Sequence, residues 1–276
     1  MIKKQIQTVL SRVGLHQRLR FSFLYDVYWG IADRSLLESR DQEIEFFRRT
    51  LVGFKPGDII FDVGANLGHK TGIFLRLGAR VVAVEPDRSN QEILKQSFLQ
   101  FRIAKKAVTI VDKAVSDHTG TEIMFVDEAG SAKNTLNKKW VDTLRADSTR
   151  FGKTLDFTEE AQVETITVEE LIETQGRPFY MKIDVEGYEP AVLRGLRTPI
   201  PYVSFEVNLP EFLPEARECI ELLEGVAANG GFNYAADCTR GFDLPAWQPM
   251  DKFLSQVEAC KAPCIEIFWR APRNER

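Results

Sequence analysis

Short runs of apolar residues alternate along the chain with longer stretches in which apolar residues recur every three or four positions. The run at 59–62 is apolar and β-branched, as in a buried parallel strand, and it stops before Gly64. A helix is predicted from about Asn66, and a second apolar strand at 81–84 ends on Glu85. Strand, glycine turn, helix, strand and acid together form a βαβ unit.

The same two periods predict the remaining elements. Ile44, Phe47 and Leu51 recur at helical spacing, so a helix should precede the first strand. Ser89 and Glu92 have the spacing of a capping box and should start the helix that follows the second strand. Further strands are predicted at 108–111, 121–126, 163–167, 179–183, 203–207, 232–236 and 265–269.

Three more helices complete the pattern. One is predicted at 168–174, and a second has Pro190 in its first turn and ends near Gly195. The third is amphipathic from Ala216 to Ala227, and residues 229–231 should cap its end. Strands that alternate with helices predict an α/β fold with a doubly wound, mostly parallel sheet.

Two segments lack this regularity. Residues 127–160 are polar without clear periodicity, and such a segment inside a compact domain is usually functional, so we expect it to shape the substrate pocket. Residues 1–30 are basic and amphipathic, which is compatible with peripheral membrane contact or with a helical lid, and the lid is favoured. We therefore divide the chain into an N-terminal appendage, 1–52, and a main domain, 53–276.

Composition narrows the class of protein. The 276 residues are 44% hydrophobic and 28% charged, as in ordinary globular domains. The formal charge of −4 and pI of about 5.6 argue against nucleic acid as a partner. No apolar run approaches a membrane span and no signal peptide is visible, so a cytoplasmic protein is expected. The four cysteines have irregular spacing, which predicts reduced thiols and no metal site.

The first βαβ unit is typical of adenosine-binding proteins, and two failed patterns narrow its cofactor. The phosphate loop of nucleotide hydrolases requires a glycine where His69 stands. The dinucleotide fingerprint has one residue between its first two glycines, whereas three separate Gly64 from Gly68. What remains is D-x-G-x-N-x-G with Glu85 placed 23 residues after Asp62. S-adenosylmethionine suits this remainder because it has an amino-acid end and a ribose but no phosphate.

Several segments in this order are similar to a known family. FDVGANLG at 61–68, VEP at 84–86, MKIDVEG at 181–187 and LRGL at 193–196 resemble the FkbM family of S-adenosylmethionine-dependent methyltransferases. The resemblance covers about 54–207. It implies a class I methyltransferase, Rossmann-like fold with a seven-stranded sheet and an antiparallel last strand. It also implies methyl transfer to hydroxyl oxygens of sugars, glycolipids or polyketides.

The resemblance implies the cofactor site as well. Residues after the first strand should line the methionine end, Glu85 should hold the ribose, and residues after the third strand should lie beside the adenine. The predicted cofactor-binding set is Asp62, Gly64, Ala65, Asn66, Gly68, Glu85, Pro86, Asp87, Asp112, Lys113 and Ala114. For any one of these residues alone, a plain turn or cap would be the simpler interpretation.

The catalytic candidates follow the later strands. Asp184 leads as general base, because open α/β sheets bind ligands beyond the carboxyl ends of their strands. Lys182 lies on the same face of its strand and can pair with Asp184 and keep it ionised, or contact the substrate. Glu186 is expected to orient the loop or the acceptor, and Glu206 ranks second among the bases. His69 is a further candidate, although a residue without a catalytic role is favoured there.

Two alternatives remain open for the acidic motif. Asp184 and Glu186 could hold a divalent cation, although two carboxylates are a weak metal signal, or they could merely cap the Pro190 helix. We expect an O-methyltransferase acting on a hydroxyl of a sugar, glycolipid or natural product, with a small-molecule or glycan acceptor as partner. The alternatives are an N-methyltransferase and a non-catalytic cofactor-binding module that scaffolds a glycan-synthesis enzyme. The sequence does not indicate an oligomeric state.

Overall fold

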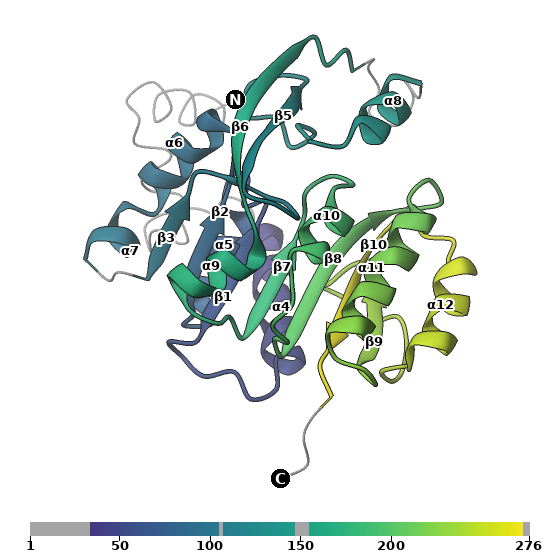
Figure 1. Ribbon diagram of the computed structural model, residues 1–276. Helices are drawn as coiled ribbons and strands as arrows, with labels where there is room; N and C mark the ends of the chain where they lie inside the picture. The colour runs from purple at the N-terminus through teal and green to yellow at the C-terminus, as the bar shows by residue number, and fades with distance from the viewer. Residues whose placement is uncertain (1–33, 105–106, 147–154, 273–276) are drawn as a thin grey trace.

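The core of the protein is a seven-stranded sheet, seen in a computed structural model that describes residues 34–104, 107–146 and 155–272 (Figure 1). Its strand order is β3-β2-β1-β7-β8-β10-β9. All neighbouring strands pair in parallel except β10, which runs antiparallel to both β8 and β9. The strands are β1 (Ile59–Val63), β2 (Arg80–Val84), β3 (Val108–Val111), β7 (Tyr180–Ile183), β8 (Tyr202–Asn208), β9 (Gly231–Ala235) and β10 (Cys264–Arg270). The predicted sheet with an antiparallel last strand is confirmed.

Helices cover both faces of this sheet. In Figure 1, α4 and α5 lie behind the sheet, and α9, α10 and α11 lie in front of it. Between α4, α5 and the sheet lies an aromatic cluster that includes Phe47, Phe74 and Tyr180. The front cluster is larger and joins Phe61, Met181 and further strand residues to the helices. The helices are α4 (Arg34–Thr50), α5 (His69–Arg76), α6 (Arg88–Ser97), α7 (Leu99–Ile103), α9 (Val168–Gln175), α10 (Glu189–Arg194), α11 (Leu213–Val226) and α12 (Met250–Glu258).

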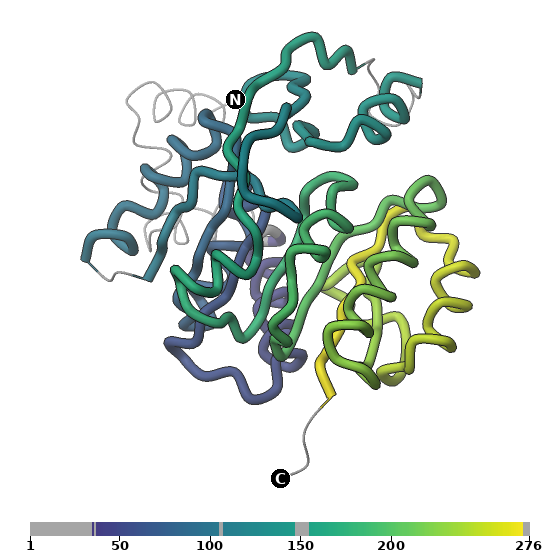
Figure 2. The backbone as a smooth tube through the Cα atoms, viewed as in Figure 1, coloured from purple at the N-terminus to yellow at the C-terminus, as the bar shows by residue number. Residues whose placement is uncertain are grey.

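A smaller lobe stands over the carboxyl ends of the parallel strands. It is a three-stranded sheet in the order β4-β6-β5, with strands β4 (Ala114–Val115), β5 (Gly120–Val126) and β6 (Glu159–Ile166). The connection between β5 and β6 contains α8 (Lys138–Ala146) (Figure 2). The expected loop at 127–160 is therefore partly helix. Trp140 explains the helix, because its fully buried ring packs edge-on against the Phe212 ring, with 5.2 Å between the ring centroids.

Three predicted helix boundaries are wrong. The helix after β1 begins at His69 instead of near Asn66, because Asn66 and Gly68 have left-handed φ angles of 47° and 80°. The start of α6 is capped by Asp87, whose side chain accepts from two backbone N–H groups, so the predicted capping box is absent there. The last predicted cap, 229–231, lies beyond α11, whose C-cap is Ala227 in an extended conformation.

Only part of the predicted N-terminal appendage, 1–52, lies in the described residues. Residues 1–33, which include the basic segment, lie outside the described residues. The predicted helix before β1 is α4, which packs on the sheet through Phe47. The boundary at residue 52 stays a prediction. In the described part of the chain, no helix is long and apolar enough to cross a membrane.

Candidate functional site

The predicted motifs meet where β1, β2 and β7 end. These strands are parallel neighbours, so the residues that follow them converge at one edge of the sheet. The Asp184 N–H donates to the Val63 carbonyl at 2.9 Å, which ties the two loops together. A Cβ on Gly64 would lie 1.9 Å from the Asp184 carbonyl oxygen, and Gly64 has a φ of +79°. Only glycine permits this approach of the first motif to the acidic motif.

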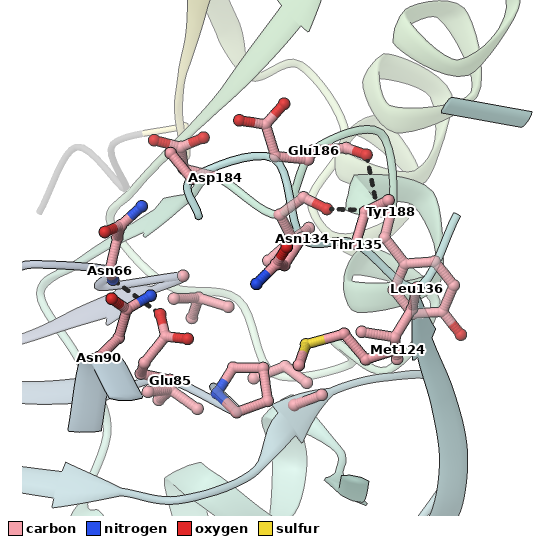
Figure 3. Close-up of a pocket in the computed structure, with 18 of the residues that line it drawn as sticks. Asn66, Glu85, Asn90, Met124, Asn134, Thr135, Leu136, Asp184, Glu186 and Tyr188 are labelled. Atoms are coloured by element: carbon pink, nitrogen blue, oxygen red, sulfur yellow. Dashed lines mark hydrogen bonds between the residues drawn. The ribbon is translucent and has the colours of Figure 1, made fainter. Parts of the chain in front are cut away.

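The carboxylate of Glu85 is held by the backbone on both sides. It accepts the N–H of Asn66 at 2.7 Å and the N–H of Asp87 at 2.8 Å. The left-handed turn at Asn66 is what directs that N–H toward the carboxylate. Glu85 is 5% exposed, and burial raises its pKa to about 7. Figure 3 shows this carboxylate at the edge of a cavity, beside Asn66 and Asn90.

This cavity brings together eight of the predicted site residues. One end of it is formed by the βαβ unit and the residues after β3, and the other by the acidic motif. The predicted residues that line it are Gly64, Asn66, Glu85, Pro86, Lys113, Ala114, Asp184 and Glu186. The predicted cofactor and catalytic residues are thus partly in one place.

The other predicted site residues do not line this cavity. Asp62 is 1% exposed and accepts the Thr71 hydroxyl at 2.5 Å, and burial raises the pKa of Asp62. A Cβ on Gly68 would lie 2.5 Å from the Phe98 ring, so Gly68 lets α5 approach α6. Ala65 is buried in the apolar cluster that also contains Phe98, whereas Asp112 is exposed. These four residues support or flank the cavity; Asp87, Lys182 and Glu206 have other contacts.

Lys182 lies beneath the acidic motif. Its ammonium pairs with the Asp184 carboxylate at 2.7 Å, as predicted, while only 2% of Lys182 is exposed. Burial alone would lower the pKa of Lys182, but the charges of Asp184, Glu266 and Asp62 outweigh it and raise that pKa. Lys182 therefore remains a buried cation that compensates the surrounding carboxylates.

Glu186 and Glu206 place two further carboxyl groups near Asp184. Glu186 has a left-handed φ of 54°, and Figure 3 shows its carboxylate beside that of Asp184. Burial and the Asp184 charge raise the pKa of both Glu186 and Glu206. Glu206 lines a separate, smaller pocket near Phe212.

The start of α10 is occupied by a different acid. The Glu189 carboxylate accepts the N–H groups of Val185 and Gly187 at 3.1 and 3.2 Å, and burial raises its pKa to about 8. Its N-cap, Tyr188, makes no side-chain cap. The carboxylates of Asp184 and Glu186 line the cavity, so capping by these two residues does not describe the site.

Metal binding and His69 receive no support from the geometry. Among residues 34–104, 107–146 and 155–272, no group of three or more His, Cys, Asp or Glu side chains is placed to hold a metal. His69 is exposed at the start of α5, outside the cavity lining.

Sequence reasoning missed the residues that close the cavity. Ser131, Asn134 and Thr135 lie in the stretch predicted as a polar loop, and Asn90 and Tyr188 follow the two predicted motifs. For Ser131, Asn134 and Thr135, the one signal in the sequence was the polarity of the stretch 130–135. The side chains of Asn134, Thr135 and Tyr188 contact groups that lie 47, 51 and 72 positions away, so the polarity of the stretch could not indicate those contacts.

A wider cleft, of about 790 Å³, lies between α4 and residues 238–247, and its wall includes Phe46, Phe242 and Trp247. None of the predicted site residues lines this cleft. The arrangement of carboxylates and backbone donors that suits a nucleoside is found at the strand ends, so the strand-end cavity is the candidate functional site.

The strand-end cavity fits S-adenosylmethionine better than a nucleotide phosphate. Val63, Val84 and Met124 give it apolar walls, and Glu85 offers a carboxylate for a diol. Lys113 is the one cation among the described residues that line it, and Lys113 pairs with Glu164 at 3.0 Å. A cradle of free cations for phosphate is therefore not formed by these residues.

The sequence model of the methyltransferase FkbM domain matches residues 62–234. Among solved structures, an FkbM methyltransferase from Methylobacillus flagellatus KT is 16% identical with a TM-score of 0.49, over 80% of this chain and 46% of that chain. A precorrin-6y C5,15-methyltransferase from Geobacter metallireducens GS-15 is 11% identical with a TM-score of 0.40, over 84% and 87% of the two chains. No curated protein matches the sequence.

Proposed function

Because the chain belongs to the FkbM family of methyltransferases, which use S-adenosylmethionine, we propose that it methylates a hydroxyl of a sugar, glycolipid or natural product. One observation carries this proposal: a single cavity has the Glu85 carboxylate at one end and the Asp184 carboxylate at the other. The first suits a ribose diol and the second suits an acceptor that must lose a proton.

In this proposal, the cofactor is held by groups from three strand ends. Glu85 accepts the two ribose hydroxyls, since its carboxylate is fixed by the Asn66 and Asp87 N–H groups. The turn at Gly64 lies against the methionine end, and the backbone at Lys113 and Ala114 lies beside the adenine. Asp62 and Asp87 do not contact the cofactor; they support its site by fixing the start of α5 and the start of α6.

When bound, S-adenosylmethionine supplies a methyl group on a positively charged sulfur, and the acceptor oxygen that bonds to this methyl displaces a neutral thioether, which keeps the electron pair of the broken C–S bond. Asp184 takes the hydroxyl proton of the acceptor. Lys182 holds the Asp184 carboxylate at 2.7 Å and fixes its direction. Glu186 orients the acceptor, and Glu206 adds to the negative potential around it.

A hydroxyl acceptor is preferred to an amine for a chemical reason. A neutral amine attacks without first losing a proton, whereas a hydroxyl becomes a strong nucleophile only as its proton leaves. The Asp184 carboxylate in the cavity wall can accept this proton and therefore suits O-methylation. We further propose a small-molecule or glycan acceptor rather than nucleic acid, and a peripheral membrane contact through residues 1–30 if that acceptor is a glycolipid.

The test is transfer of a labelled methyl group from S-adenosylmethionine to a panel of neutral carbohydrate, glycolipid and amine acceptors. The proposal predicts transfer to a hydroxyl compound that falls at least about a hundredfold in Asp184→Asn. Transfer to amines alone would support the N-methyltransferase instead. Cofactor binding without transfer to any acceptor, in either form, would leave the scaffolding module as the better description.

A further inference from the structure

The segment that closes the cavity is a strap formed by residues 127–137, between β5 and α8. The strap contributes Ser131, Ala132, Asn134, Thr135 and Leu136 to the cavity wall. Thr135 exchanges two backbone hydrogen bonds with Phe125, so the strap folds back on the end of β5. Its residues line the cavity from the proposed cofactor end to the acidic end.

On the cofactor side, the strap is fixed by Asp87. One oxygen of the Asp87 carboxylate caps α6, and the other accepts the Gly130 N–H at 3.0 Å and the Asn134 side-chain amide at 2.8 Å. The carbonyl oxygen of the Asn134 side chain accepts the Asp127 N–H at 3.0 Å, which closes the strap into a loop. The Asp87 N–H also donates to Glu85, so the residue that holds the strap is hydrogen-bonded to the carboxylate proposed to bind the ribose.

On the acidic side, the strap is fixed by Thr135. This residue is 1% exposed, and its hydroxyl donates to the Glu186 carbonyl at 2.9 Å while it accepts the Asn137 N–H at 2.9 Å (Figure 3). The Asn137 side-chain amide donates in turn to the Gly187 carbonyl. The backbone at Glu186 is left-handed, a conformation that a non-glycine residue keeps only when its surroundings hold it there.

We propose that Asn134 and Thr135 are positioning residues that connect the two ends of the cavity. Asn134 ties the strap to Asp87 beside the cofactor carboxylate, and Thr135 ties the same strap to the backbone of Glu186. Cofactor binding at Glu85 then orders the strap, and the strap orders the acidic loop 183–187 for the acceptor. This inference rests on the proposed function, because it takes Glu186 as an acceptor-contacting residue.

The physical basis is the cost of an unpaired buried group. Thr135→Val keeps the shape of the side chain but leaves the Glu186 carbonyl without its hydroxyl donor and the Asn137 N–H without its acceptor. The acidic loop should relax from its left-handed conformation, while the contacts around Glu85 remain. Thr135→Ser keeps the hydroxyl and should restore the wild-type behaviour.

The kinetic test measures methyl transfer and cofactor binding separately. Thr135→Val should lower kcat roughly tenfold or more, with Thr135→Ser within about threefold of wild type. A matched control is Thr143→Val in α8, which removes a hydroxyl that donates to the Lys139 carbonyl outside the cavity; it should leave kcat unchanged. Equal kcat values in Thr135→Val and wild type would overturn the proposal.

Hydrogen exchange supplies a readout that does not depend on turnover. In wild type, S-adenosylmethionine should slow amide exchange in both the strap and residues 183–187. In Thr135→Val it should still slow exchange in the strap but no longer in 183–187, and in Asn134→Ala the protection of 183–187 should also be lost. Unchanged protection of 183–187 in both variants would show that the cofactor acts on the acidic loop directly, and would sink the proposal.

The two hypotheses fail in different ways. If wild type transfers methyl groups but both strap variants keep wild-type exchange and kcat, the inference is wrong and the proposed function stands. If wild type shows cofactor-dependent protection of both segments but transfers no methyl group, the strap connection stands and the proposed function is wrong.

Discussion

The contact between Gly64 and the Asp184 backbone gives the sharpest structural prediction. Gly64→Ala places a Cβ 1.9 Å from the Asp184 carbonyl oxygen and 2.8 Å from its carbon, at a φ of +79°. The left-handed backbone costs an alanine roughly 1–2 kcal/mol. Forcing the neighbouring backbone apart costs roughly 1–3 kcal/mol more, and the Asp184 N–H to Val63 carbonyl bond adds about 1 kcal/mol if it breaks. With that bond lost, we expect a total loss of roughly 3–6 kcal/mol of unfolding free energy.

Gly57→Ala is the matched control, because Gly57 has a φ of +97° but no atom lies within 4 Å of the place that the new methyl group would take. It should lose only the backbone part, roughly 1–2 kcal/mol. Urea unfolding followed by tryptophan fluorescence compares the two variants, and S-adenosylmethionine titration should show weaker binding for Gly64→Ala alone. Equal unfolding losses and equal affinities in the two variants would refute the close approach of the two motifs.

Two further predictions concern buried charge. Lys182→Met removes the buried cation that pairs with Asp184 and lies near Asp62 and Glu266, so unfolding free energy should fall by about 3–5 kcal/mol, and an unchanged urea midpoint would contradict this. The pKa of Glu85 is about 7 in the free protein, and ribose hydroxyls that donate to the ionised carboxylate should lower it in the complex. The complex then holds fewer protons, so calorimetric affinity should rise from pH 6 to pH 8; Glu85→Gln should abolish that rise, and a flat wild-type profile would argue against ribose binding by Glu85.

The parts of the site that follow strands directly were predictable from sequence. Gly64, Glu85 and Asp184 each come just after a buried apolar run, and parallel topology brings such positions to one edge whatever the loops do. The sheet order follows the same logic, because alternating strands and helices allow few arrangements. Local pattern and global fold agree there.

The rest depended on contacts between distant residues. Asp87 was predicted to flank the ribose, but its partners Gly130 and Asn134 lie 43 and 47 positions away, and they make it the attachment point of the strap. Thr135 and Glu186 are 51 positions apart. Side-chain to backbone bonds of this range leave no periodicity in a sequence.

Two helices escaped prediction for a related reason. In α12, Phe253 and Val257 are the buried residues, which is too short a stripe to stand out from a loop. In α8, the apolar residues around Trp140 are surrounded by charge, and the helix is explained by the tertiary contact of that ring with Phe212. Both helices owe their stability to packing more than to pattern.

In the proposed function, the strand-end cavity binds S-adenosylmethionine through Glu85 and carries out proton transfer through Asp184. Titration calorimetry with S-adenosylmethionine on wild type, Glu85→Ala and Asp184→Asn separates the two roles, because only the role of Glu85 should affect cofactor binding. We predict that wild type and Asp184→Asn bind with similar affinity and that Glu85→Ala binds roughly tenfold to a hundredfold more weakly, since it loses hydrogen bonds to a charged group. No binding by wild type, or equal affinity in Glu85→Ala, would contradict the account.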